Sequence, residues 1–277
     1  MLRQRVVTAL VLLAILLPAL VARTPWPFAV VTLLLIGAAG WEWARLNGLA
    51  AFALVSGVLL GLACALALWA DLPERVPPWV WWAATAGWVL GGGLALRSGP
   101  AAWPKLPSGA RWVLGMLLLF VAWLALAVAR EAGINFILSI LCLVWVADIA
   151  AYFGGRRFGR RKLALSISPG KSWEGAASGM LGALLLAVLW VGLDRNVGVD
   201  SASLYSRLLE RLGWAGLVPA VAVLAAMSVV GDLFESLVKR AAGAKDSSAL
   251  LPGHGGVLDR IDALLPVFPI ALAMAAL

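Results

Sequence analysis

The chain has 277 residues, of which 63% are hydrophobic and only 13% are charged. Soluble domains typically carry about 25% charged residues, so this composition excludes an ordinary soluble protein and predicts an integral membrane protein. We attribute the formal net charge of +8 to cytoplasmic loops rich in Lys and Arg, and we do not expect nucleic acid as a partner.

Nine apolar runs are long enough to cross a bilayer, which requires roughly 17–25 residues. They lie near residues 6–22, 26–44, 49–70, 78–96, 112–129, 133–153, 175–193, 213–231 and 262–277. The connections between them are short and rich in Pro and Gly. We therefore predict an all-α fold, a polytopic transmembrane helical bundle with about nine spans.

Lys and Arg are unevenly divided between alternate connections. An N-terminus inside the cell places sixteen of the 22 Lys and Arg residues on the inner side and six on the outer side. This bias predicts a cytoplasmic N-terminus and two cytoplasmic charge-rich loops. The first run also has the features of a signal peptide, namely a basic start, an apolar middle and small residues near its end. Its removal would leave the orientation of the other spans unchanged.

Acidic residues gather in the second half of the chain. Glu42 lies at the inner end of the second run, within "WEWARL", and seven more lie at inner span ends or in inner loops: Asp148, Glu174, Asp232, Glu235, Asp246, Asp259 and Asp262. An acidic residue at the bilayer centre costs about 2.5–3.5 kcal/mol. Several of them together require compensation by cations, a metal ion or water.

The first charge-rich segment covers residues 147–175. Asp148 and Tyr152 are four residues apart at the inner end of the sixth run, and four arginines and Lys162 follow them. Anionic lipid is one explanation for these basic residues. It does not explain Asp148, or the turn "SISPGKSWEG" that leads into the seventh run with the polar residues Ser168, Lys171 and Ser172.

A polar stripe marks the eighth run, "SVVGDLFESLVKR". In a helix, Asp232, Glu235, Ser236 and Lys239 occupy one face. Such a stripe points at a protein interior or a wet cavity and away from lipid. The alternative is a stripe of ion pairs that only locks two helices together.

The second charge-rich segment, "KDSSALLPGHGGVLDRID", contains the single histidine of the chain. Its glycines predict a loop whose backbone N–H groups can bind an anion, although His254 could equally serve only to hold that loop. Carboxylates beside it suit Mg²⁺, which binds carboxylate and phosphate oxygens. Together with the nearby cations these groups indicate phosphoryl-type transfer: Gly255, Gly256, Asp259, Asp262, Lys239, Arg240, Lys245 and Arg260.

The 27 residues from Ser236 to Asp262 resemble the signature of the phosphatidate cytidylyltransferases, or CDP-diacylglycerol synthases. The segments "AYFGGRRFG", "SPGKSWEG" and "WEWARL" are similar to that family as well, although Gly170 stands where a lysine is expected. The resemblance is strong from residue 133 onward. We therefore divide the chain into N-terminal transmembrane helices, 1–132, and a catalytic transmembrane region with cytoplasmic loops, 133–277.

The resemblance implies an all-helical, Mg²⁺-dependent, homodimeric enzyme of the bacterial inner membrane. It would join CTP to phosphatidate at the cytoplasmic face, giving CDP-diacylglycerol and pyrophosphate. The expected metal ligands are Asp232 and Asp259 first, then Asp246, with Asp148 and Asp262 acting directly or through water, and a second cation is plausible. The expected substrate contacts are Tyr152, Ser168, Lys171, Ser172, Lys239, Arg240, Lys245, His254, Gly255, Gly256 and Arg260.

Two other functions remain open. A related CTP-dependent lipid-alcohol kinase would transfer the γ-phosphate and release CDP. An ion-coupled transporter would use the carboxylates without catalysis. Transporters of that kind often contain inverted repeats and place their sites at the membrane midplane. This chain has no obvious repeat, and its polar groups gather on one side.

Overall fold

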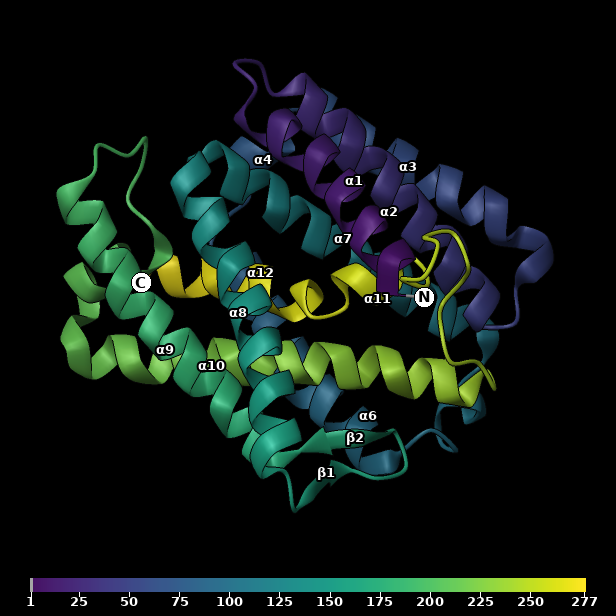
Figure 1. Cartoon of the computed structure of the whole chain (residues 1–277). Helices are drawn as coiled ribbons and strands as arrows, with labels where there is room; N and C mark the ends of the chain where they lie inside the picture. Colours follow the sequence, from purple (N-terminus) through teal and green to yellow (C-terminus); the bar gives the residue numbers. More distant parts are fainter. Residues whose placement is uncertain (1) are drawn as a thin grey trace.

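The computed structural model shows a bundle of helices with one small β-hairpin (Figure 1). It describes residues 2–277, with side chains from Val7 onward except Ala9, so the predicted inner charges of Arg3 and Arg5 lie outside the described side chains. The elements in chain order are α1 (Leu2–Val21), α2 (Trp26–Leu46), η1 (Ala50–Phe52), α3 (Ala53–Trp69), α4 (Leu72–Arg75), α5 (Trp79–Ala86), η2 (Gly87–Gly92), α6 (Gly93–Ser98), η3 (Trp103–Lys105), α7 (Ser108–Glu131), α8 (Ile134–Phe158), β1 (Lys162–Ala164), β2 (Ser168–Ser172), α9 (Trp173–Asn196), α10 (Leu204–Ala241), α11 (Leu258–Ile261) and α12 (Leu264–Ala275).

Within residues 2–277, six helical segments are long and apolar enough to cross a membrane. They are α2, η1 with α3, α7, α8, α9 and α10. The predicted span at 78–96 forms α5, a π-helical turn and α6 in succession, and the predicted span at 262–277 contains the 12-residue helix α12. The class of helical membrane protein is thus confirmed, and the count of nine spans stays a prediction.

Helices α8 and α9 pack closely because glycines line their contact. A methyl group added at Gly175 would lie 3.0 Å from the carbonyl oxygen of Ala151, and one at Gly179 would lie 2.8 Å from that of Ala147. Small residues let membrane helices approach in this way. The close contact fixes the hairpin that joins the two helices.

The 38-residue helix α10 crosses the whole molecule and bends at Gly213, where φ is +63°. It packs against α8, α9 and α12. A side chain at Gly231 would meet the carbonyl oxygen of Asp262 and the ring of Pro266. Glycine at this position therefore lets α10 pass directly against the junction of α11 and α12.

Residues 162–172 form an antiparallel hairpin, with Lys162 paired to Ser172. This segment was expected to be a turn, so the two strands correct that detail. The backbone N–H of Trp173 donates to the carbonyl oxygen of Arg161 (3.0 Å) and extends the pairing to the start of α9. The hairpin is small, and helices still form nearly all of the described structure.

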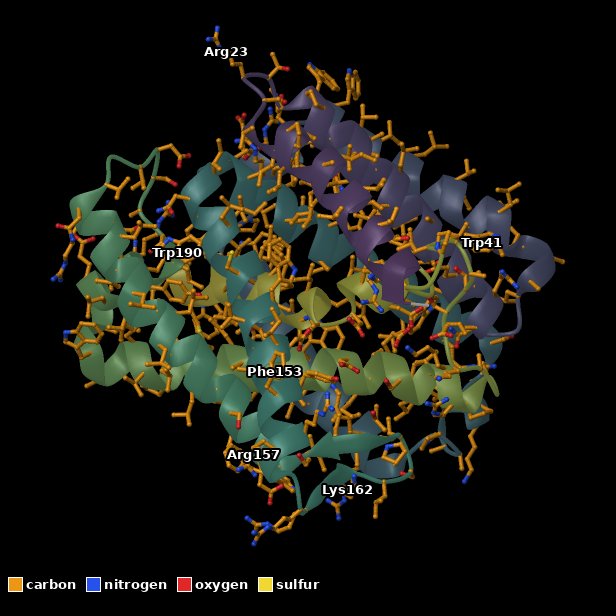
Figure 2. All side chains as sticks on the ribbon, viewed as in Figure 1. Arg23, Trp41, Phe153, Arg157, Lys162 and Trp190 are labelled. Carbon is orange, nitrogen blue, oxygen red and sulfur yellow. The ribbon has the colours of Figure 1, made fainter. Side chains whose placement is uncertain are left out.

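The two ends of the bundle carry different connections. Arg157 and Lys162, predicted to be inner residues, lie at the opposite end of the molecule from Arg23, predicted to be an outer one (Figure 2). This separation agrees with alternate connections lying on opposite membrane sides. The direction relative to the cell stays a prediction.

Candidate active site

The loop between α10 and α11, residues 242–257, is tightly folded. The backbone N–H of His254 donates to Leu251 (2.8 Å), and that of Leu251 donates to Gly255 (2.8 Å). Gly253 and Gly255 have φ values of +75° and +82°, which glycine adopts without steric cost. The structure thus confirms the predicted loop around His254.

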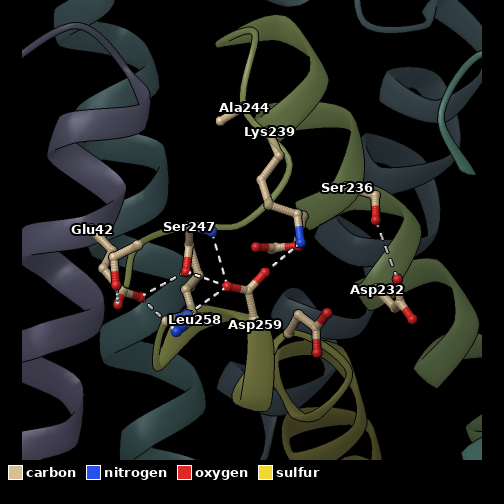
Figure 3. Close-up of polar contacts among 12 residues, drawn as sticks. Glu42, Asp232, Ser236, Lys239, Ala244, Ser247, Leu258 and Asp259 are labelled. Carbon is tan, nitrogen blue, oxygen red and sulfur yellow. Dashed lines mark hydrogen bonds and ion pairs between the residues drawn. The ribbon is translucent and has the colours of Figure 1, made fainter. Parts of the chain in front are cut away.

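Asp259 is the centre of the polar cluster drawn in Figure 3. Its Oδ2 accepts hydrogen bonds from the backbone N–H and hydroxyl of Ser247 (2.9 and 2.7 Å) and from Gly256 N–H (2.7 Å). Its Oδ1 accepts from Lys239 Nζ (2.5 Å). Burial opposes ionisation, but the hydrogen bonds from Lys239, Gly256 and Ser247 outweigh it and lower the pKa of Asp259.

The stripe on α10 is engaged in ion pairs. Lys239 pairs with Glu235, one turn earlier, as well as with Asp259. Asp232 pairs with Lys171 Nζ of β2 (2.5 Å) and accepts a hydrogen bond from Ser236 (3.3 Å). The predicted face therefore exists, and its two lysine pairs connect α10 to α11 and to the hairpin.

Glu42 has a role that sequence reasoning missed. Its side chain is fully buried and accepts hydrogen bonds from the hydroxyls of Ser247 (3.1 Å) and Ser248 (2.6 Å). It also accepts from the backbone N–H groups of Val257 (2.9 Å) and Leu258 (2.7 Å). The position of Glu42 inside "WEWARL", at an inner helix end, was the only available signal.

The hairpin brings Lys171 to α10, and several of its residues serve to hold it. Ser172 caps α9 by accepting from Gly175 N–H (3.1 Å), and Arg240 of α10 donates to the Ile167 carbonyl (3.3 Å). Ser168 is half-buried and Gly170 is exposed. An added Cβ at Gly170 meets no atom within 4 Å. The lysine expected at this position would therefore fit, and its absence removes a positive charge without changing the packing.

The remaining predicted residues surround this cluster at different depths. Asp148 and Asp262 both interact electrostatically with Asp232, and Arg260 interacts with Asp148. The exposed members of the predicted set are Asp148, Tyr152, Arg240, Lys245, Asp246 and Arg260. The Tyr152 ring is 61% exposed and packs edge-on against Phe153. The structure thus joins the buried carboxylates and lysines, and places the exposed residues at their border.

Charge balance shows whether this site suits a divalent cation. Its linked groups comprise five carboxyl groups and three cations, so the carboxyl groups outnumber the cations by two: Asp148, Asp232, Glu235, Asp259 and Asp262 with Lys171, Lys239 and Arg260. Buried Glu235 Oε1 has no hydrogen-bond partner among the described residues.

The same carboxylates do not converge into a complete ligand shell. Within residues 2–277 no three His, Cys, Asp or Glu side chains are close enough to hold a metal ion by themselves. Mg²⁺ typically takes one or two carboxylates and completes its shell with phosphate oxygens and water. The oxygen donors, with carboxyl groups in excess of cations, therefore fit Mg²⁺ together with a phosphate ligand.

Comparison with known proteins agrees with this geometry. The model of the Cytidylyltransferase family matches residues 3–277. A phosphatidate cytidylyltransferase of Pseudomonas aeruginosa is 39% identical over 99% of this chain and 97% of its own length. Another, of Haemophilus influenzae, is 36% identical over 97% and 96%, and one of Thermotoga maritima is 41% identical over 53% and 51%. The chain therefore belongs to the cytidylyltransferase family.

Proposed function

We propose that this chain transfers CMP from CTP to phosphatidate, giving CDP-diacylglycerol and pyrophosphate. The observation that carries the proposal is the convergence of paired lysines and carboxylates from α10, α11 and β2 within a bundle of apolar helices. The names of relatives that match almost the whole chain support the same reaction.

In the proposed reaction a phosphate oxygen of phosphatidate attacks the α-phosphorus of CTP. The new P–O bond forms as the bond from the α-phosphorus to the bridging oxygen of the β-phosphate breaks, and pyrophosphate leaves with that electron pair. A phosphate monoester is already largely ionised near neutral pH, so no side chain has to remove a proton. The chain must bind, orient and neutralise two anionic substrates.

Lys171 and Lys239 are suited to that neutralisation. Each holds its ammonium group 2.5 Å from a carboxylate, and each is partly or largely buried. An ammonium group has three N–H donors, so each lysine can bind a phosphate oxygen while it keeps its carboxylate partners. Lys245 and Arg260 are exposed at the border of the site and would meet the substrate as it enters.

We further propose that Asp232 and Asp259 would hold Mg²⁺, with Asp246, Asp148 and Asp262 as further ligands. Bound Mg²⁺ would supply charge neutralisation of the triphosphate and polarise the reacting phosphoryl group, and a second cation could join it. The excess of two carboxyl groups over cations at the site supports this proposal.

The proposed location is the bacterial inner membrane, with the N-terminus and the active site facing the cytoplasm. The basic hairpin end supports this orientation, because cytoplasmic connections are rich in Lys and Arg. A lipid and a soluble triphosphate can both reach a site only at the membrane surface. We also propose a homodimer, as the family resemblance implies, which cross-linking in native membranes can test.

The decisive experiment incubates the purified protein with radiolabelled CTP, phosphatidate and Mg²⁺. We expect stoichiometric pyrophosphate and CDP-diacylglycerol, a strong preference for CTP over UTP, and loss of turnover with excess EDTA that added Mg²⁺ restores. Release of CDP would identify a kinase instead. Absence of any product, together with carboxylate-dependent ion uptake in proteoliposomes, would favour a transporter.

A further inference from the structure

We infer that Glu42, from the N-terminal half of the chain, is a positioning residue that fixes the segment 246–258, which covers most of the loop and the first residue of α11, and thereby aims Asp259 at Lys239. This inference rests on the proposed function only in treating Asp259 as part of the reacting centre. Glu42 lies on α2, 205 residues before Ser247 in sequence. It does not touch the ion pairs of the stripe in Figure 3 and acts through the loop.

The hydrogen bonds of Glu42 match the capacity of an ionised carboxylate. Such a group offers about four acceptor sites and no donor. Oε1 accepts from Ser248 Oγ (2.6 Å) and Val257 N–H (2.9 Å). Oε2 accepts from Leu258 N–H (2.7 Å) and shares the single hydroxyl proton of Ser247 (3.1 Å) with Asp259. The side chain is 0% exposed, so water cannot replace a lost partner. A neutral amide cannot satisfy all four donors.

The four donors come from both ends of one loop. Ser247 and Ser248 lie near its start, and Val257 and Leu258 lie at its end, directly before Asp259. Glu42 therefore clamps the two ends together. Figure 3 shows this arrangement, with Glu42 on one side of the loop and Asp259 on the other.

Ser247 links the clamp directly to the reacting centre. Its hydroxyl lies 3.1 Å from Glu42 Oε2 and 2.7 Å from Asp259 Oδ2. A side chain at Gly256 would overlap both Ser247 Oγ and Glu42 Oε1, so the loop fits tightly against the carboxylate. A shift at Glu42 is thus passed on to Asp259 and its contact with Lys239.

The test compares wild type with Glu42→Gln, which keeps the size of the side chain but removes its charge and points an NH₂ group at the donors of the loop. We expect kcat for pyrophosphate release to fall about tenfold or more. Hydrogen–deuterium exchange should rise in peptides covering 245–258 and stay unchanged in α7 and α8. Glu42→Asp keeps the charge and should recover part of both losses.

Ile36→Val is the matched control, because Ile36 is a buried residue of the same helix (4% exposed) whose apolar side chain cannot hydrogen-bond to the loop. It should lower the thermal midpoint without changing kcat or exchange in the loop. If Glu42→Gln fails to accumulate, Ser248→Ala replaces it. That variant removes one donor to Glu42 and should give a smaller loss of kcat with the same local rise in exchange.

Unchanged kcat and unchanged loop exchange in these variants would overturn the inference. A rise in exchange spread evenly over α2, α7 and α8 would overturn it too, because it would show a general effect on packing. Failure of the unsubstituted protein to release pyrophosphate would instead refute the proposed function. The exchange measurement needs no substrate and would still decide the role of Glu42.

Discussion

Replacing Asp259 with Asn isolates a single interaction. The Asn carbonyl oxygen can take the place of Oδ2 and accept from the backbone N–H groups of Ser247 and Gly256, while the Ser247 hydroxyl can turn to Glu42. The amide NH₂ then faces the Lys239 ammonium, so the bond at 2.5 Å is replaced by two opposed donors. A hydrogen bond to a charged group contributes about 1.5–3 kcal/mol. Since about 1.4 kcal/mol corresponds to a factor of ten in rate, kcat should fall by about 10- to 100-fold from this bond alone, and further if Asp259 also binds Mg²⁺.

The assay is pyrophosphate release by protein purified in detergent, with membrane insertion and the thermal midpoint measured in parallel. Asp200→Asn is the matched control. Asp200 accepts hydrogen bonds from the backbone N–H groups of Ile134 (2.5 Å) and Asn135 (2.9 Å) at the start of α8, away from the site. It should lower stability and leave kcat near normal. Near-normal turnover by Asp259→Asn, or an equal loss in the control, would refute the reasoning.

Three further outcomes are expected. Gly256→Ala should reduce kcat about tenfold or more, because its methyl group would overlap the Glu42 carboxylate and overpacking costs about 1–3 kcal/mol. Lys171→Met should raise the KM for CTP about tenfold while leaving the protein folded, because the cation beside Asp232 is lost. The pKa of Asp259 is lower in the folded protein than in the unfolded chain, so ionised Asp259 stabilises the fold fully at any pH above its unfolded pKa. This stabilisation is lost as the pH falls through the folded pKa. The difference in thermal midpoint between wild type and Asp259→Asn should therefore be constant at neutral pH and shrink only below about pH 4.

Two substitutions control for these changes. Gly198→Ala adds a methyl group that meets no atom within 4 Å, and it should leave turnover unchanged. Lys105→Met removes an exposed lysine of η3 and should leave the KM for CTP unchanged. If Gly198→Ala lowers kcat as Gly256→Ala does, the loss does not depend on the contacts of Gly256. If Lys105→Met raises the KM for CTP as Lys171→Met does, the rise does not depend on the contact of Lys171 with Asp232.

Much of the fold follows from local sequence. Apolar runs of span length predicted the long helices, because backbone polar groups in lipid must be satisfied within a helix. Run length could not predict the π-helical turn at Gly87–Gly92 or the 38-residue length of α10, which joins a predicted outer loop to a span through the bend at Gly213. Hairpin strands between 162 and 172 were also missed, since Pro and Gly in "SISPGKS" are typical of a turn.

The candidate site was predictable where spacing determines contact. Glu235 and Lys239 are four residues apart and pair on α10 as the helical pattern indicates. The pairs of Lys239 with Asp259 and of Lys171 with Asp232 join separate elements, so they depend on how α10 packs and not on local spacing. The function of Glu42 was hidden for the same reason, because all its partners lie more than 200 residues away in sequence.

The ion pairs of the stripe also bear on its alternative interpretation as a lock between helices. A lock would be expected to balance its charges, because an uncompensated buried charge is strongly destabilising and well-packed apolar residues are often at least as stable as a buried ion pair. Here Lys239 contacts two carboxylates at once, while Glu235 keeps one buried oxygen without a hydrogen-bond partner among the described residues. Asp148 and Asp262 add further negative charge beside Asp232. Carboxyl groups in excess of the cations bind either protons or a cation, and a lock between helices needs neither, so their excess favours a binding site over a structural lock.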